Sequence, residues 1–218
     1  MTGTSGPIGA AVAARLAADG YRIIGCARSR SGAGDRYVVA DVTVEADVER
    51  VVAAALPGLA LVVHVAGDAD GVRAGVDGPP ASVSDAAVDR FLAIGLRAPV
   101  LLARHALPRM TGGGAFVFVS SIATVHPFPG MTAYTAGKAA LEAFARQLAA
   151  DHGAEGIRSN VVRAGPIDRD DGYRRLVLTP RVGWAADVAE AVAYLAGAGF
   201  VTGAVLPVDG GASIKGAG

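Results

Sequence analysis

A tyrosine and a lysine, Tyr134 and Lys138, stand four residues apart, and Ser121 precedes the tyrosine by thirteen positions. Residues at positions i and i+4 share one face of a helix, so we expect the phenol and the ammonium to lie side by side. An ammonium beside a phenol stabilises the phenolate and lowers its pKa towards neutral pH. The pattern predicts general acid–base chemistry at Tyr134, with Ser121 hydrogen-bonding a substrate oxygen.

The chain opens with a glycine-rich run, TGTSGPIG at positions 2–9, and an alanine-rich stretch follows at once. A glycine-rich turn entering a helix exposes backbone N–H groups and the positive end of the helix dipole, which suits a pyrophosphate. Such a turn also begins many helices that bind nothing. The candidate phosphate contacts are Gly3, Thr4, Ser5, Ile8 and Gly9.

Short β-branched runs alternate with alanine-rich stretches between these residues. The predicted strands span 21–26, 37–39, 59–65, 115–120, 157–163 and 205–208, and the predicted helices span 7–19, 45–55, 83–110, 133–152 and 185–196. The strands are continuous apolar runs, which is typical of a parallel sheet covered on both faces. We therefore expect an α/β fold, a Rossmann-like doubly wound parallel sheet, in a single domain over 1–218.

The composition excludes several functions. Twenty basic and twenty acidic residues cancel among 218, so the chain lacks the positive excess of a nucleic-acid binder. Cys26 is the single cysteine, and His64, His105 and His152 have no metal-ligand spacing, so we expect neither disulfide nor metal. No apolar run is long enough to span a membrane, and no secretory signal is evident. We expect a soluble cytoplasmic enzyme of small-molecule substrates; His126, between Ser121 and Tyr134, is either a substrate contact or structural.

Taken together, these motifs resemble the short-chain dehydrogenase/reductase family. The family opens on T-G-x-x-x-G-x-G and closes on a strand resembling the VTG and VDGG runs at 201–203 and 208–211. The resemblance implies that Tyr134 is the general acid/base, that Lys138 lowers its pKa and binds the nicotinamide ribose, and that Ser121 orients the carbonyl or alcohol. It also implies a homodimer or homotetramer, built on helices 83–110 and 133–152. These carry apolar residues on several faces, including Leu101, Leu102, Leu141, Phe144 and Leu148.

The expected preference between NADP(H) and NAD(H) follows from the residues that would bind the adenosine end of the dinucleotide. Ala27 stands where an NAD-selective member has a carboxylate, and Arg28 follows it. An arginine holds a phosphate bidentately, so NADP(H) is expected, unless Arg28 is a solvated loop charge. Asp41 matches the family's residue at the adenine, and it is alternatively a helix N-cap. The further cofactor contacts that the resemblance implies are Ser29, Asp41, Val42, Ala66, Gly67, Tyr134, Lys138, Gly165, Pro166 and Ile167.

Several positions depart from the family pattern. Pro7 replaces the middle glycine, His64 replaces the first asparagine of N-N-A-G, and Gly95 replaces the asparagine that helps hold a proton-relay water. Either a second water fills the space at Gly95 or the relay is absent. The first strand is missing or truncated ahead of Thr2, or the true start lies upstream. These departures keep open a non-redox enzyme (a dehydratase, isomerase or cyclase) using Tyr134 and Ser121, and a catalytically weak binding protein.

Overall fold

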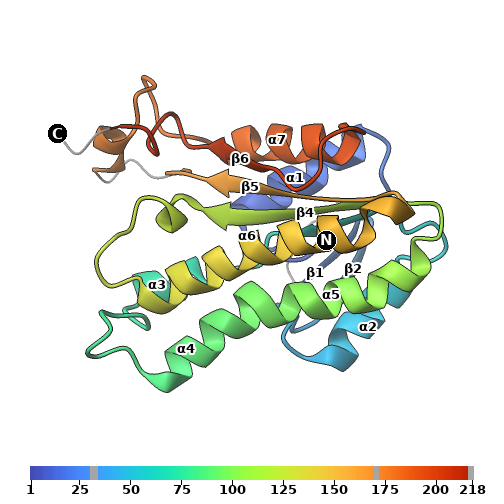
Figure 1. Ribbon diagram of the computed structural model, residues 1–218, viewed down its shortest axis with the longest axis horizontal. Coiled ribbons are helices and arrows are strands. Elements are labelled where there is room, and N and C mark those ends of the chain that lie inside the picture. Colours follow the sequence, from blue (N-terminus) through green and yellow to red (C-terminus); the bar gives the residue numbers. More distant parts are fainter. Residues whose placement is uncertain (30–33, 169–171, 216–218) are drawn as a thin grey trace.

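The computed structural model describes residues 1–29, 34–168 and 172–215. Its strands pair in parallel in the order β2, β1, Thr2, β3, β4, β5, β6, where Thr2 makes single bridges to Cys26 in β1 and His64 in β3 (Figure 1). The predicted α/β fold with a parallel sheet is confirmed. The strands are β1 (Ile24–Ala27), β2 (Arg36–Val39), β3 (Leu61–His64), β4 (Gly114–Ser121), β5 (Ile157–Ala164) and β6 (Val205–Val208).

Helices cover both faces of this sheet. One face carries α1 and α7, which pack against each other, and the other carries α2, α4, α5 and α6 (Figure 1). None of the helices in the described ranges is long and apolar enough to cross a membrane. The helices are α1 (Pro7–Ala18), α2 (Glu45–Ala54), α3 (Ala69–Arg73), α4 (Asp85–Leu92), α5 (Ala98–Ala106), α6 (Thr132–His152) and α7 (Ala185–Gly197).

The central strand β4 explains why the strands read as continuous apolar runs. Successive side chains of a strand point to opposite faces. Phe116 and Phe118 pack into the core under α5 and α6, whereas Val117 and Val119 pack into the core under α1 and α7. Both cores need apolar residues, so no polar alternation remains.

The leucines that suggested an assembly surface belong to this core. Leu101, Leu102, Leu141 and Leu148 are each at most 3% exposed, and Phe144 packs against them. The sequence interpretation of these side chains as surplus apolar faces was therefore wrong. They fill the layer between α5, α6 and the sheet.

Met1 and Thr2 form a short bridge between β1 and β3, directly ahead of the phosphate turn. The Thr2 N–H donates to the Val63 carbonyl at 2.9 Å, and the Cys26 N–H donates to the Met1 carbonyl at 2.9 Å. These bonds join β1 to β3 and fix the start of the glycine-rich turn. A cavity of about 250 Å³ lies beside the bridge, between β1, β3 and the ends of α1 and α2.

The helix predicted over 83–110 is present from Asp85 to Arg109 and contains a π-helical turn. It forms α4, then a π-helical turn over Ala93–Arg97, then α5 and a 3-10 turn over Leu107–Arg109. Pro99 has no N–H to donate and its ring crowds the carbonyl four residues earlier, at Gly95. A wider π turn accommodates both effects within the helix, so the predicted helix is present and only its π turn was not predicted.

Candidate active site

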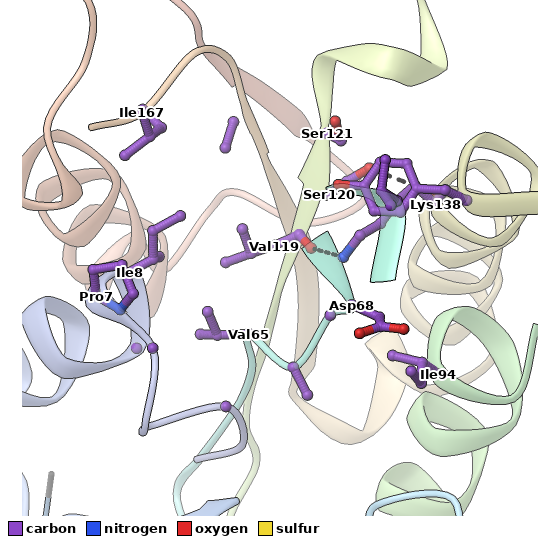
Figure 2. A pocket seen from close by; sticks show the side chains of 18 of the residues that line it. Pro7, Ile8, Val65, Asp68, Ile94, Val119, Ser120, Ser121, Lys138 and Ile167 are labelled. Carbon is purple, nitrogen blue, oxygen red and sulfur yellow. Dashed lines mark hydrogen bonds between the residues drawn. The ribbon is translucent and has the colours of Figure 1, made fainter. Parts of the chain in front are cut away.

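One cavity of about 1100 Å³ lies across the carboxyl ends of β1, β3, β4 and β5. Ligands of open α/β sheets bind at this edge, because the loops that leave the strands converge there. Figure 2 shows Pro7 and Ile8 on one side of the cavity and Ser121 and Lys138 on the other. The predicted site residues that line it are Gly3, Ser5, Ile8, Gly9, Arg28, Ser29, Asp41, Val42, Ala66, Gly67, Ser121, Tyr134, Lys138, Gly165, Pro166 and Ile167.

The three candidate catalytic side chains meet on one wall. Tyr134 lies in the first turn of α6 and Lys138 one turn later, with its Nζ 6.0 Å from the centre of the Tyr134 ring. Lys138 Nζ donates to the Val119 carbonyl at 2.9 Å. Ser121 ends β4, and its Oγ accepts from the Ala123 N–H at 3.2 Å. The predicted i, i+4 face is thus present.

Burial changes the pKa values of Tyr134 and Lys138. Burial raises the pKa of Tyr134, and a hydrogen bond with Ser121 opposes this rise. Burial lowers the pKa of Lys138 to about 8. The lowering of the Tyr134 pKa by Lys138, which the family resemblance implies, stays a prediction. The ammonium also lies close to the end of β3, where a Cβ added at Gly67 would be 3.5 Å from Nζ.

The glycine-rich turn is tight. A Cβ on Gly9 would lie 2.1 Å from the Gly3 carbonyl oxygen, and a Cβ on Gly3 would lie 2.6 Å from the Ala66 nitrogen. Gly3 also has a φ of +73°, which favours glycine. The turn enters the twelve-residue α1 with Pro7 as its first residue, a position where proline is tolerated. Thr4 is 1% exposed, hydrogen-bonds the Cys26 carbonyl and does not line the cavity, so its cofactor contact stays a prediction.

The adenosine end contains Arg28 and Ser29 after β1 and Asp41 and Val42 after β2. Asp41 Oδ1 accepts from the Thr43 N–H at 2.9 Å and from its hydroxyl at 2.7 Å. Asp41 therefore closes a turn ahead of α2. The alternative of an N-cap is wrong, since the residue at that position is Val44.

His64 and Gly95 stand at positions where the family pattern has asparagine, and their contacts follow from burial and close packing. The His64 ring is fully buried, with Nδ1 2.9 Å from Thr2 Oγ1 and Nε2 3.2 Å from the Ile94 carbonyl. Burial, with the nearby charge of Lys138, lowers the pKa of His64 to about 3. A Cβ on Gly95 would lie 2.4 Å from the Gly137 carbonyl. The α6 backbone thus occupies the side-chain position where a second water was considered.

Sequence reasoning missed several residues of the cavity. Asp68 directly follows Gly67, is 5% exposed, and has its Oδ2 2.5 Å from Arg90 Nε. The position of Asp68 at the end of β3 was a signal that the sequence offered.

His126 does not line the cavity; its ring packs on Phe128, which does. Met131 and Tyr173 also line it. No cluster of metal-ligating side chains occurs in the residues that the structure describes.

The comparisons with known proteins agree with this geometry. The family model described as enoyl-(acyl carrier protein) reductase matches residues 3–213. A short-chain type dehydrogenase/reductase from Mycobacterium ulcerans superposes with a TM-score of 0.89 at 30% identity, over 98% of this chain and 88% of the other. The chain belongs to the short-chain dehydrogenase/reductase family. Its fold, turn and Tyr-x-x-x-Lys helix are those of an oxidoreductase family.

Three further relatives show the range of this short-chain dehydrogenase/reductase family. The 2-(R)-hydroxypropyl-CoM dehydrogenase of Xanthobacter autotrophicus is 32% identical over 96% of both chains. A blue fluorescent protein from a metagenomic library, solved with NADPH, is 35% identical with a TM-score of 0.86, covering 96% of this chain and 95% of its own. A 3-ketoacyl-(acyl-carrier-protein) reductase from Brucella melitensis, solved with NADH, is 25% identical with a TM-score of 0.88, covering 97% and 96%. Membership of the family therefore does not decide between NADPH and NADH as the cofactor.

Proposed function

We propose that the protein is an NADP(H)-dependent oxidoreductase that interconverts a carbonyl and an alcohol on a small-molecule substrate. The observation behind this proposal is that Ser121, Tyr134 and Lys138 share one wall of the cavity, opposite the glycine-rich turn. A hydroxyl, a phenol and an ammonium around one space are suited to proton transfer at a carbonyl oxygen.

The residues present fit a dinucleotide. The close backbone approach at Gly3 and Gly9 leaves the start of α1 open to a pyrophosphate, although Pro7 offers no N–H. In the proposal, Arg28 and Ser29 hold the adenosine end and its 2′-phosphate, with Asp41 and Val42 beside the adenine. Gly67 and the run at 165–167 border the nicotinamide. When bound, this group supplies or accepts the hydride.

The acid–base roles follow from the same wall. In the reducing direction Tyr134 gives its phenolic proton to the substrate oxygen, and in the oxidising direction it takes that proton back. Ser121 hydrogen-bonds the same oxygen as negative charge develops on it. Lys138 donates one N–H to the Val119 carbonyl, which leaves two for the ribose and the phenolate.

The cofactor preference is tested by titrating the protein with NADPH and NADH. Arg28 makes charge-assisted hydrogen bonds to a 2′-phosphate, which correspond to a preference for NADPH of about tenfold or more. Arg28→Ala should remove most of this preference and leave NADH affinity within about twofold. Equal affinities for the two cofactors in the unmodified protein would refute the NADP(H) assignment.

The redox assignment is tested at Tyr134. Tyr134→Phe keeps the ring volume and removes the proton donor, so turnover should be abolished while NADPH affinity stays nearly unchanged. Lys138→Met should damage both, since the ammonium serves phenol and ribose. Product formed after NADP(H) is stripped away, or without its consumption, would instead establish the non-redox alternative of dehydration, isomerisation or cyclisation.

We also propose that the protein assembles as a homodimer or homotetramer. This proposal rests on the family resemblance, and two-fold association is the commonest oligomer geometry. Light scattering at micromolar concentration should give a multiple of the 21.8 kDa chain mass. A monomeric mass would refute the assembly.

A further inference from the structure

The catalytic tyrosine lies in the weakest turn of its helix. α6 begins at Thr132, so Tyr134 is its third residue. The first four N–H groups of a helix have no partner within the helix, and this turn frays unless a cap holds it. The residue in the N-cap position, Met131, makes no side-chain cap. A residue from elsewhere must therefore fix the backbone at Tyr134.

Asp77 provides that cap from a distant segment. It lies between α3 and α4, more than fifty residues earlier in the chain. Its Oδ2 accepts from the Tyr134 N–H at 2.8 Å, and its Oδ1 accepts from the Ala133 N–H at 3.1 Å. Oδ1 also accepts from the Gly78 N–H at 2.8 Å, which fixes the carboxylate itself. A carboxylate here satisfies two orphan donors and complements the positive end of the α6 dipole.

The segment that contains Asp77 leaves the floor of the cavity. It starts at Gly67 and Asp68, which line the cavity, whereas Asp77 itself does not. A shift of this segment is therefore transmitted directly to the backbone of Tyr134. The phenol must keep its place relative to Ser121 on β4, an element that the cap does not contact.

From these contacts we infer that Asp77 is a positioning residue for Tyr134: its carboxylate couples the segment after β3 to the first turn of α6 and so sets where the phenol lies. The inference rests on the proposed role of Tyr134. Asp77 touches neither the reacting atoms nor the cofactor space. Its removal should therefore lower kcat and leave NADPH binding unaffected.

The experiment compares Asp77→Ala with Ser84→Ala, a matched loss of a helix cap. Ser84 is exposed and caps α4, its Oγ accepting from the Ala87 N–H at 3.2 Å. Both changes should lower the melting temperature by a few degrees, about 2–4 °C. Only Asp77→Ala should lower kcat for NADPH-dependent carbonyl reduction, by about 10- to 100-fold, because a displaced catalytic group costs rate steeply. NADPH Kd should stay within about twofold in both variants. Equal losses of kcat in the two variants would overturn the inference.

Asp77→Asn provides the conservative variant. Its amide oxygen accepts one of the two N–H groups, so kcat should fall between those of the unmodified protein and Asp77→Ala. This variant also keeps the test open if Asp77→Ala does not fold. A kcat for Asp77→Asn no higher than that of a folded Asp77→Ala would contradict the cap.

A titration without substrate separates this inference from the proposed function. The absorbance of tyrosinate near 295 nm, minus that of the corresponding Tyr134→Phe background, reports the pKa of Tyr134. Asp77→Ala and Asp77→Asn remove the same charge, so a difference between their Tyr134 pKa values measures the lost positioning. We expect the two values to differ. Equal values would overturn the role of Asp77 even if no carbonyl is reduced, whereas absent turnover with unequal values would count against the oxidoreductase proposal alone.

Discussion

Glu142 holds the ends of β4 and β5 against α6, one turn after Lys138. Its Oε1 accepts from Ser120 Oγ, Thr124 Oγ1 and Arg163 Nε, each at 2.9 Å, and its Oε2 accepts from Arg163 Nη2 at 2.6 Å. The side chains of Glu142 and Arg163 are 6% and 16% exposed. Glu142 is thus buried and Arg163 is partly buried, beside Ser120 in β4.

Replacing Glu142 tests this arrangement. Glu142→Ala leaves the Arg163 guanidinium buried without its counter-charge, which costs about 3–5 kcal/mol of unfolding free energy. Glu142→Gln keeps an acceptor and loses only the charge assistance, about 1–2 kcal/mol. Urea unfolding measures both, with Glu190→Ala as the control. Glu190 pairs with Arg15 at the surface and is 66% exposed, so its loss should cost less than about 1 kcal/mol.

The pH dependence of folding stability gives a second test of the pair formed by Glu142 and Arg163. Burial raises the pKa of Glu142, but the hydrogen bonds from Arg163, Ser120 and Thr124 outweigh it and hold the pKa below its ordinary value. A carboxylate with a lowered folded-state pKa stabilises the protein above its unfolded pKa, and this contribution is lost as the pH falls. A loss below 1 kcal/mol for Glu142→Ala, or equal losses for both Glu142 variants, would refute the buried-pair argument.

Three more outcomes follow from the site. His64 stays neutral down to a pKa of about 3, whereas the unfolded ring protonates near 6.5. Stability in urea unfolding should therefore fall by about 1.4 kcal/mol per pH unit below 6.5, and His64→Asn should flatten this slope. Lys138 loses its charge above a pKa of about 8, so NADPH affinity by fluorescence titration should weaken between pH 7 and 9, and a Lys138→Met variant should lack that change. Gly95→Asn, which restores the family residue, should unfold the protein at a lower temperature in calorimetry, since its Cβ would lie 2.4 Å from the Gly137 carbonyl; an unchanged melting temperature would contradict the close packing there.

Local features of this protein could be predicted from the sequence. The spacing of Tyr134 and Lys138 fixes their common helix face, and Ser121 ends a strand whose carboxyl end must lie at the ligand edge. The turn at Gly3 and Gly9 is likewise local, because its glycines are required by close backbone contacts within the turn and to Ala66.

Contacts between distant segments could not be predicted in this way. Asp77 and Tyr134, and Glu142 and Arg163, are joined only when the chain folds, and neither pair has a sequence period that signals it. The π-helical turn between α4 and α5 did have a signal in Pro99, which removes a donor and crowds the preceding turn. The apolar pattern of 83–110 does not show this turn, since that pattern records burial and not the local type of helix.

The departures from the family pattern at His64 and Gly95 belong to one rearrangement. With glycine at 95 and at 137, the π turn and α6 approach until their backbones touch, so no side chain fits between them. The Ile94 carbonyl in that turn then faces the His64 ring, whose other nitrogen meets the Thr2 hydroxyl. Thr2 in turn accepts from the Ala66 N–H at 3.2 Å. One neutral imidazole thereby links the helix, the end of β3 and the bridge that Thr2 makes between β1 and β3. Residues that separately look like losses thus depend on one another, and restoring a single asparagine should not restore the family arrangement.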